Sequence, residues 1–267
     1  MNWQQQTCLL TGATGGIGQA IAHALASKGV TLILQGRNEE RLLALAALLP
    51  GDHQILVADL ATASGLTAIS EAMTVTPEFS MLINNAGIGQ FSALQYTSAE
   101  EANEVINTNL TAPILLTQRL LPLLNKDSES HIINVGSVLG SIGFAGQSLY
   151  CASKFGLRGF SEALYRELAD TNIRVSYFAP RATATSINSQ QAMAMNTQLG
   201  TAVDTADKVA KALIDQLKQG KTRRVVGFPE RLFVKINGAF PSIVDKALLK
   251  KLPVIKRFIF QNTKEAL

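Results

Sequence analysis

Short apolar runs alternate along the chain with longer stretches in which apolar residues recur at helical spacing. The runs predict strands at Thr7–Leu10, Thr31–Gln35, Ile55–Ala58, Met81–Asn84, His131–Gly136, Arg174–Ala179 and Arg224–Gly227. They are almost wholly apolar, which is typical of parallel strands buried on both faces. The stretches between them predict helices such as Gly18–Lys28, Glu39–Leu49, Ala99–Leu124, Leu149–Ala169 and Ala206–Gln219. This alternation predicts an α/β fold, a Rossmann-like, doubly wound, seven-stranded parallel sheet with helices on both faces.

The pattern changes in two places. Residues 181–205 are mostly small and polar, with no strong periodicity. Residues 229–267 carry spaced apolar residues among lysines and arginines, and Pro241 and Pro253 divide them into short helical stretches. We therefore expect a single Rossmann domain over residues 1–228 and a basic amphipathic helical extension over residues 229–267.

Composition narrows the class of protein. With 267 residues, 47% of them hydrophobic, the chain can bury a large core. Its two cysteines, Cys8 and Cys151, provide neither a disulfide framework nor a zinc set, so we expect no metal site. The first residues do not resemble a signal peptide, and no apolar run reaches the roughly 18 residues of a membrane span. These features favour a cytoplasmic protein, with peripheral contact at a membrane surface as an alternative.

The net charge of +4 is unevenly distributed along the chain. Residues 221–267 have a net charge of +8, whereas residues 1–220 have a net charge of −4. The basic character therefore belongs to the C-terminal segment. An acidic body without a recognised nucleic-acid motif argues against a nucleic-acid partner.

A glycine-rich segment, TGATGGIG from Thr11, follows the first predicted strand and opens a helix. Gly12 permits a tight turn, while Gly16 and Gly18 let a pyrophosphate approach the backbone and the helix pack closely. Free N–H groups and the helix dipole then favour phosphate binding. The alternative is a glycine-rich turn without a ligand, but the strand–turn–helix context favours a dinucleotide site.

The end of the second strand informs cofactor choice. A carboxylate there would bind a ribose 2′-hydroxyl, but this chain has Gln35, Gly36 and Arg37. The arginine favours the 2′-phosphate of NADP(H), with NAD(H) as the alternative. Asp59, after the third strand, is expected either to accept from the adenine amino group or to cap the next helix.

Three side chains suggest the chemistry. Tyr150 and Lys154 lie four residues apart, on one face of a predicted helix. A tyrosine with a pKa near 10 is a poor base at neutral pH, and a neighbouring ammonium group would lower that pKa. Ser137 ends a strand at the carboxyl edge, where it is either a turn residue or a group that holds a substrate oxygen.

In this order and spacing, these motifs resemble those of the classical short-chain dehydrogenase/reductase family over roughly residues 5–227. The resemblance also covers Asn84–Gly87, Asn109, and Pro180 with Thr185. It implies a hydride transfer between NADP(H) and an alcohol or ketone, with Tyr150 as general acid/base. Ser137 would orient the carbonyl, Lys154 would bind the nicotinamide ribose and lower the tyrosine pKa, and Asn109 would hold a relay water. The implied cofactor contacts are Gly12, Thr14, Gly16, Ile17, Gly18, Arg37, Asp59, Leu60, Asn85, Ala86, Gly87, Tyr150, Lys154, Pro180, Thr183 and Thr185.

The chain departs from the family pattern at several positions. Arg181 replaces the usual glycine after Pro180, where it would either select acidic substrates or point into solvent. Gly136 replaces a small polar residue, which we expect to be harmless. The basic residue that the family's NADP-type members carry in the glycine-rich loop is absent, so the predicted cofactor preference rests on Arg37 alone. Pro113 cannot bond the carbonyl of Asn109, which predicts a kink that either frees this carbonyl for the relay water or only improves packing.

The last two segments leave alternatives open. In residues 186–203 the apolar side chains Ile187, Met193, Met195 and Leu199 either close over an apolar substrate or belong to a short packed helix. The basic extension either contacts a membrane or lipid-like substrate, or packs on the body or a second subunit. It would also obstruct the contact that builds family tetramers, which favours a homodimer through the two long helices over a tetramer.

Two functions remain to be separated. The first is an NADP(H)-dependent oxidoreductase that acts on a small alcohol or carbonyl compound, apolar or lipid-like in character. The second is a non-catalytic dinucleotide-binding sensor or scaffold on the same fold. The complete set of Asn109, Ser137, Tyr150 and Lys154 favours the enzyme.

Overall fold

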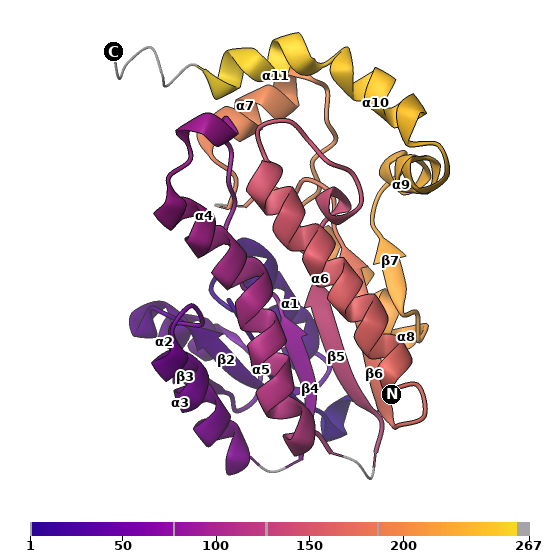
Figure 1. Ribbon diagram of the computed structural model, residues 1–267. Coiled ribbons are helices and arrows are strands. Elements are labelled where there is room, and N and C mark those ends of the chain that lie inside the picture. Colours follow the sequence, from indigo (N-terminus) through magenta and orange to yellow (C-terminus); the bar gives the residue numbers. More distant parts are fainter. Residues whose placement is uncertain (1, 77, 126–127, 186, 261–267) are drawn as a thin grey trace.

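A parallel sheet forms the centre of the protein (Figure 1), whose computed structural model describes residues 2–76, 78–125, 128–185 and 187–260. The strand order is β3-β2-β1-β4-β5-β6-β7, and every neighbouring pair is parallel, which confirms the predicted fold class. The strands are β1 (Thr7–Leu10), β2 (Thr31–Gly36), β3 (Gln54–Val57), β4 (Phe79–Asn84), β5 (Ser130–Val135), β6 (Ile173–Ala179) and β7 (Arg223–Val225).

Helices cover both faces of the sheet (Figure 1). On one face, α1 (Gly16–Ala26), α2 (Glu39–Leu48) and α8 (Ala206–Lys218) share an apolar core with the strands. On the other face, α3 (Ala63–Thr74), α5 (Ala112–Leu120) and α6 (Ser148–Glu167) do the same. Helix α3 is the helix expected after Asp59, for which no range was predicted. It begins after Thr62, whose hydroxyl caps it by accepting the N–H of Gly65 at 3.0 Å.

The single helix predicted over Ala99–Leu124 is wrong, because the structure divides it. Helix α4 (Ala99–Ile106) is followed by a π-helical turn, η3 (Asn107–Thr111), then by α5 and the short 3₁₀ turn η4 (Leu121–Leu123). In the π turn the N–H of Ala112 bonds the carbonyl of Asn107, five residues earlier. Pro113 has no N–H to continue an α-helical ladder here, so the irregularity expected at this proline takes the form of a π turn.

The carboxyl ends of the strands meet at one edge of the sheet. The strand order reverses between β1 and β4, so a crevice for a ligand is expected there. Helices α7 (Gln190–Gln198), α9 (Glu230–Ala239), α10 (Pro241–Leu249) and α11 (Leu252–Ile259) lie above this edge (Figure 1). Three further 3₁₀ turns complete the described elements: η1 (Trp3–Gln5), η2 (Leu94–Tyr96) and η5 (Val138–Gly140).

The C-terminal helices pack on the body through one face. Of the predicted alternatives for the extension, packing on the body is therefore correct for this face. Val244 and Ile255 are buried, and Val244 clusters with Val138 and Ile142 of the body. The side-chain amide of Asn237 donates to the carbonyl of Ser141 at 2.8 Å. Within the described residues, no helix is long and apolar enough to cross a membrane. Residues 261–267 of the predicted extension lie outside the described residues.

Candidate active site

The glycine-rich turn between β1 and α1 is built by close backbone contacts. Gly12 has a positive φ of 61°, and a Cβ atom there would lie 2.7 Å from the Cα of Ala86. A Cβ atom on Gly18 would lie 2.2 Å from the carbonyl oxygen of Gly12. Both positions therefore require glycine, which brings the first turn of α1 against the end of β1 as a dinucleotide site needs.

The N-terminus of α1 is suited to an anion. Its N-cap is Gly15, no side chain among the described residues caps it, and the first residues of the helix line the crevice, where an anion could accept from their N–H groups. Thr185 lies across from it, because a Cβ atom on Gly16 would meet the Thr185 methyl group at 2.7 Å. The Thr185 hydroxyl oxygen is buried and has no hydrogen-bond partner in the described part of the chain. These residues fit a bound dinucleotide, which would give this hydroxyl a partner.

The segment after β4 is fastened to the glycine-rich turn by Thr11. Its hydroxyl accepts the N–H groups of Asn85 at 2.9 Å and Ala86 at 3.0 Å. The side-chain amide of Asn85 donates to the carbonyls of Thr11 and Gly12. Thr11 was therefore an overlooked site residue, although its place at the head of the glycine motif was a signal. The bonds fix Asn85, Ala86 and Gly87 along the wall of the crevice.

Charged and polar groups that follow β2 and β3, with one from α2, stand at the end of the crevice next to these strands. Arg37, Asp59 and Leu60 all line it. Asp59 accepts the N–H of Ala61 at 2.9 Å but does not cap the following helix, where Thr62 is the N-cap. The guanidinium of Arg41 donates to the carbonyl of Thr14 at 3.0 Å. A second arginine therefore stands at this loop, so Arg37 is not the only basic group there.

The backbone of Ser137, just beyond β5, is hydrogen-bonded by the hydroxyl of a tyrosine of β6. The hydroxyl of Tyr177 accepts the N–H of Ser137 at 3.3 Å and donates to its carbonyl at 3.2 Å. A Cβ atom on Gly136 or Gly140 would lie 2.2 Å from the Tyr177 side chain. The glycine at position 136 is therefore not a neutral replacement, because it makes room for the ring that holds Ser137. No local sequence pattern predicts this pairing, because its members are 40 residues apart.

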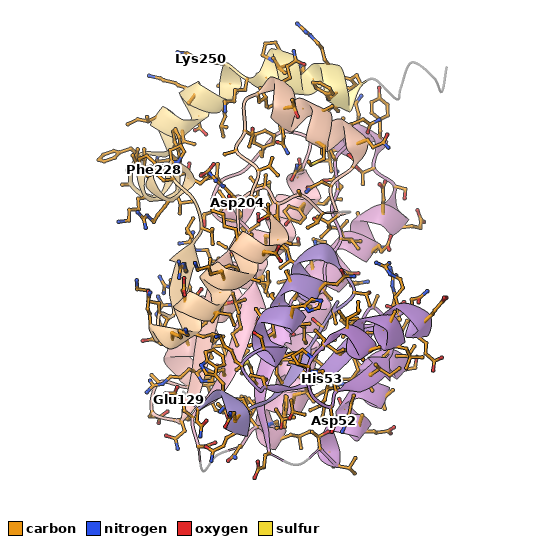
Figure 2. All side chains as sticks on the ribbon, turned by 180° about the vertical axis from the view of Figure 1, so that it is seen from behind. Asp52, His53, Glu129, Asp204, Phe228 and Lys250 are labelled. Atoms are coloured by element: carbon orange, nitrogen blue, oxygen red, sulfur yellow. The ribbon has the colours of Figure 1, made fainter. Side chains whose placement is uncertain are left out.

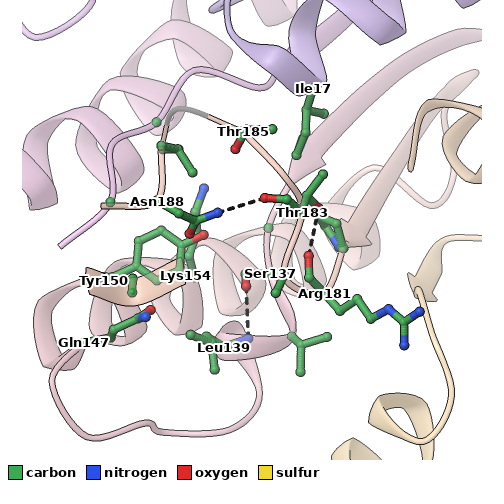
Figure 3. Close-up of a pocket in the computed structure, with 18 of the residues that line it drawn as sticks. Ile17, Ser137, Leu139, Gln147, Tyr150, Lys154, Arg181, Thr183, Thr185 and Asn188 are labelled. Atoms are coloured by element: carbon green, nitrogen blue, oxygen red, sulfur yellow. Dashed lines mark hydrogen bonds between the residues drawn. The ribbon is translucent and has the colours of Figure 1, made fainter. Parts of the chain in front are cut away.

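Tyr150 and Lys154 project from the first turns of α6 toward Ser137 (Figure 3). Burial raises the pKa of Tyr150 above its ordinary value, and a hydrogen bond with Ser137 acts in the opposite direction. The predicted lowering of this pKa by Lys154 is therefore wrong for the protein alone. The Lys154 ammonium is itself buried, which lowers its pKa to about 8. It lies 5.8 Å from the centre of the Tyr150 ring and donates to the carbonyl of Val135 at 3.0 Å.

Asn109 lies in the π turn, and its side chain is fully buried. Its amide oxygen accepts the N–H of Ile88 at 2.8 Å, and its amide nitrogen donates to the carbonyl of Ile88 at 2.9 Å. The same nitrogen lies 3.2 Å from the hydroxyl of Ser153 on α6. Asn109 thus joins the β4 loop to the helix that carries Tyr150 and Lys154.

The loop after β6 lines the crevice with Pro180, Thr183 and Thr185. The hydroxyl of Thr183 donates to the carbonyl of Arg181 at 2.9 Å, and the Thr183 carbonyl accepts from the side chain of Asn188 at 2.8 Å (Figure 3). These bonds give the loop a defined shape next to α1.

Arg181 does not point into solvent, which was one of its two predicted placements. Its guanidinium makes two bonds to the carboxylate of Asp204, at 2.9 and 2.8 Å, and one to Glu230 at 3.1 Å. Its side chain is 11% exposed and that of Asp204 only 2%, so it is not a solvated arginine, and Arg181 also lines the cavity. The same carboxylate also binds Lys208 at 2.7 Å. Arg181 therefore ties the loop after β6 to the start of α8 and of the C-terminal helices.

One cavity of about 880 Å³ connects the glycine-rich turn with the C-terminal helices. Beyond Tyr150 its walls are mainly apolar, and they include the side chains of Phe91, Leu139, Ile142, Phe144, Ile187, Ala192, Phe233, Val244, Ala247 and Leu248. Of the four apolar residues predicted to close over a substrate, only Ile187 is among the described lining residues. Met195 is buried within the short helix α7, which was the alternative prediction.

The fold and the cavity together define a dinucleotide-binding α/β protein with a tyrosine, a lysine and a serine beside the cofactor site. The sequence profile of the short chain dehydrogenase family matches residues 6–196, and the chain belongs to this family of oxidoreductases.

Relatives agree with this assignment. The 3-oxoacyl-[acyl-carrier-protein] reductase FabG of Escherichia coli (strain K12) is 35% identical over 181 residues, which are 67% of this chain and 74% of the relative. A short-chain dehydrogenase from Sphingobium yanoikuyae, solved in complex with NADPH, has a TM-score of 0.77 and 28% identity, covering 90% of this chain and 95% of that one. The bulky-bulky ketone specific alcohol dehydrogenase from Comamonas testosteroni has a TM-score of 0.75 and 25% identity, with coverages of 90% and 93%.

Proposed function

We propose that the protein is an NADP(H)-dependent oxidoreductase that interconverts a ketone and an alcohol, with Tyr150 as the general acid/base. The observation that carries this proposal is the convergence of Ser137, Tyr150 and Lys154 in the cavity that begins at the glycine-rich turn. NADPH, the cofactor of the Sphingobium relative, would supply a hydride when bound here. Arg37, at the end of β2 where a carboxylate would repel a 2′-phosphate, supports NADP(H) over NAD(H).

The remaining tasks fall to the side chains of this chain. The buried, protonated Tyr150 donates a proton to the substrate oxygen as that oxygen gains negative charge. Its raised pKa keeps the phenol protonated at neutral pH, which suits reduction of a ketone. Ser137, whose backbone Tyr177 fixes, hydrogen-bonds the same oxygen and holds it beside the phenol.

Lys154 and Asn109 complete the proton path. The Lys154 ammonium near Tyr150 favours the phenolate that remains after proton donation. Both polar atoms of the Asn109 side chain are occupied by bonds to Ile88 and Ser153. We therefore assign its backbone carbonyl, rather than its amide group, to the relay water. In the cofactor site, Gly12 to Gly18 would hold the pyrophosphate, Asp59 to Leu60 the adenine, Asn85 to Gly87 the adenosine ribose, and Pro180 to Thr185 the nicotinamide.

The lining of the cavity indicates the class of substrate. Apolar side chains from the body, α7 and the C-terminal helices surround the space beyond Tyr150. Burial of apolar surface would therefore provide most of the binding energy for a substrate here. We infer a carbonyl compound with a sizeable apolar part, which agrees with the oxoacyl and bulky ketone substrates named for the two relatives.

Two structural assignments belong to this proposal. Residues 1–228 would act as the catalytic domain and the residues from 229 onward as an extension that walls its substrate cavity. A homodimer would form through α4, α5 and α6, where Leu115, Phe155 and Tyr165 are exposed large apolar side chains.

The proposal is tested by following NADPH oxidation against a panel of aliphatic, aromatic, steroid and acyl-thioester ketones. Replacing Tyr150 with phenylalanine should lower kcat on the best substrate by about 10²–10⁴-fold, as expected for loss of a general acid. Tyr165→Phe is the matched control, because Tyr165 lies on the same helix and is partly exposed to solvent. Equal rates for the wild type and Tyr150→Phe would show that the assigned mechanism is wrong.

A further inference from the structure

The outer face of the C-terminal helices remains apolar and basic after their inner face has packed on the body. Besides Phe233, which lines the cavity, five large apolar side chains are exposed on it: Phe228 (70%), Leu232 (47%), Phe240 (63%), Ile243 (55%) and Leu249 (63%). We call these five residues, with the exposed basic side chains of residues 228–260, the tail surface. Phe228 and Lys250 lie on the outside of these helices, whereas Asp204 lies between them and the body (Figure 2).

The charge of this surface is predominantly positive. Residues 228–260 carry seven basic and two acidic side chains, a net charge of +5. All seven basic side chains are exposed, namely Arg231, Lys235, Lys246, Lys250, Lys251, Lys256 and Arg257. Within the described residues, Glu230 forms the one ion pair in this segment, and its partner is Arg181 of the body. The exposed cations therefore remain available to an anionic partner.

The mouth of the active-site cavity opens at this surface. Phe233 of α9 and Lys251, between α10 and α11, both line the cavity, and both are exposed to solvent. The inner residues Val244 and Leu248 of α10 line the same cavity. The tail surface and the apolar part of the cavity therefore share the helices α9 and α10 and the residue Lys251.

We propose that the tail surface docks on an anionic lipid surface. Exposed aromatic and aliphatic side chains among lysines and arginines are the composition of helices that lie in a membrane interface. The net charge of −4 on residues 1–220 would orient the protein with its tail surface toward anionic headgroups. A second copy of the chain is a poorer occupant, because two such surfaces face to face would bring their positive charges together. The docking does not depend on the chemistry of Tyr150.

Vesicle sedimentation of the full-length protein tests the proposal. Vesicles of phosphatidylcholine alone are compared with equimolar phosphatidylcholine and phosphatidylglycerol, at low and high salt. We expect binding to the anionic vesicles, weakened by salt because salt screens exposed charges. A Lys246→Glu/Lys250→Glu variant should bind at least about tenfold more weakly, given the contribution of each basic residue near an anionic surface. A Phe240→Ser/Leu249→Ser variant should also bind more weakly.

Matched controls lie elsewhere on the surface. Lys211→Glu/Lys218→Glu changes the same charge on α8, and Leu48→Ser/Val75→Ser removes two apolar side chains that are 72% and 82% exposed. Neither control should alter vesicle binding, and ketone reduction in solution should be unchanged in all four variants. Failure of the wild type to sediment with anionic vesicles, or equal binding by tail and control variants, would overturn the proposal. So would a change from dimer to monomer in the tail variants, since it would assign the surface to a second copy.

Discussion

The ion-pair cluster around Arg181 should contribute strongly to stability, although no local pattern predicts it. Replacing Arg181 with methionine removes the guanidinium and keeps much of its length. The carboxylate of Asp204, with a side chain only 2% exposed, would then keep one cationic partner, Lys208, which is 60% exposed. Glu230 would lose its ion pair, and the carbonyl of Phe228 would lose a weaker contact at 3.5 Å.

The expected cost follows from this geometry. Removing one partner of a buried ion pair typically costs about 3–5 kcal/mol, because the other charge remains buried. Since Lys208 still contacts Asp204, we expect the low end, about 3 kcal/mol of unfolding free energy. For a chain of this size that lowers Tm by about 6–12 °C.

Urea unfolding of the wild type, Arg181→Met, Asp204→Asn and the double variant gives the measurement. The double variant should recover part of the loss, with a coupling energy of about 2 kcal/mol. Arg181 lowers the pKa of Asp204, so this stabilisation is present above the pKa of an unfolded aspartate, about 3.9, and is lost as pH falls through the lower folded value. A loss below about 1 kcal/mol at pH 7, or no coupling, would refute the reasoning, because this is the range of exposed pairs.

Three further predictions follow from the site. Gly136→Ala should destabilise the protein by about 1–3 kcal/mol and lower kcat, since the new methyl group would displace the Tyr177 ring. Gly143→Ala, with open space around it, is the control. Equal stability of the two variants would contradict the role of Tyr177 in holding Ser137. Arg37→Ala should raise KM for NADPH about tenfold and leave KM for NADH unchanged, as steady-state kinetics would show. Lys154→Met should be inactive yet about 2 kcal/mol more stable than the wild type at pH 7. The reason is that burial lowers the folded-state pKa of Lys154 to about 8, so the wild type carries a costly buried ammonium at pH 7. This cost is relieved only as the pH rises from about 8 toward 10.5, the ordinary value. Unfolding at pH 7 and pH 10 measures that difference, which should shrink at the higher pH; a less stable variant at pH 7 would contradict it.

Much of the sheet and its cofactor edge could be predicted from the sequence, because the signals are local. Parallel strands buried on both faces leave continuous apolar runs, and β1 lies at the predicted residues. The glycine-rich turn has a local signal too. Gly18 is required by the carbonyl of Gly12, six residues earlier, and Gly12 by its own positive φ and by Ala86 after the neighbouring strand β4. Tyr150 and Lys154 share one helix turn, so their proximity also follows from spacing. Chain order then brings Ser137 to the same edge, because carboxyl ends of parallel strands meet there.

What the sequence left open depended on pairs that meet only when the chain is folded. Arg181 reaches Asp204 and Glu230 across 23 and 49 residues, so its polar neighbours could not be identified from its own segment. The hydrogen bonds between the Tyr177 hydroxyl and the Ser137 backbone join residues 40 positions apart, and the Tyr177 ring overturns the expectation that Gly136 is a neutral replacement. Burial likewise decided that the pKa of Tyr150 is raised rather than lowered, because desolvation depends on everything packed around the phenol. The basic tail was visible as composition, but only packing could divide it into an inner face that walls the cavity and an outer face that remains exposed.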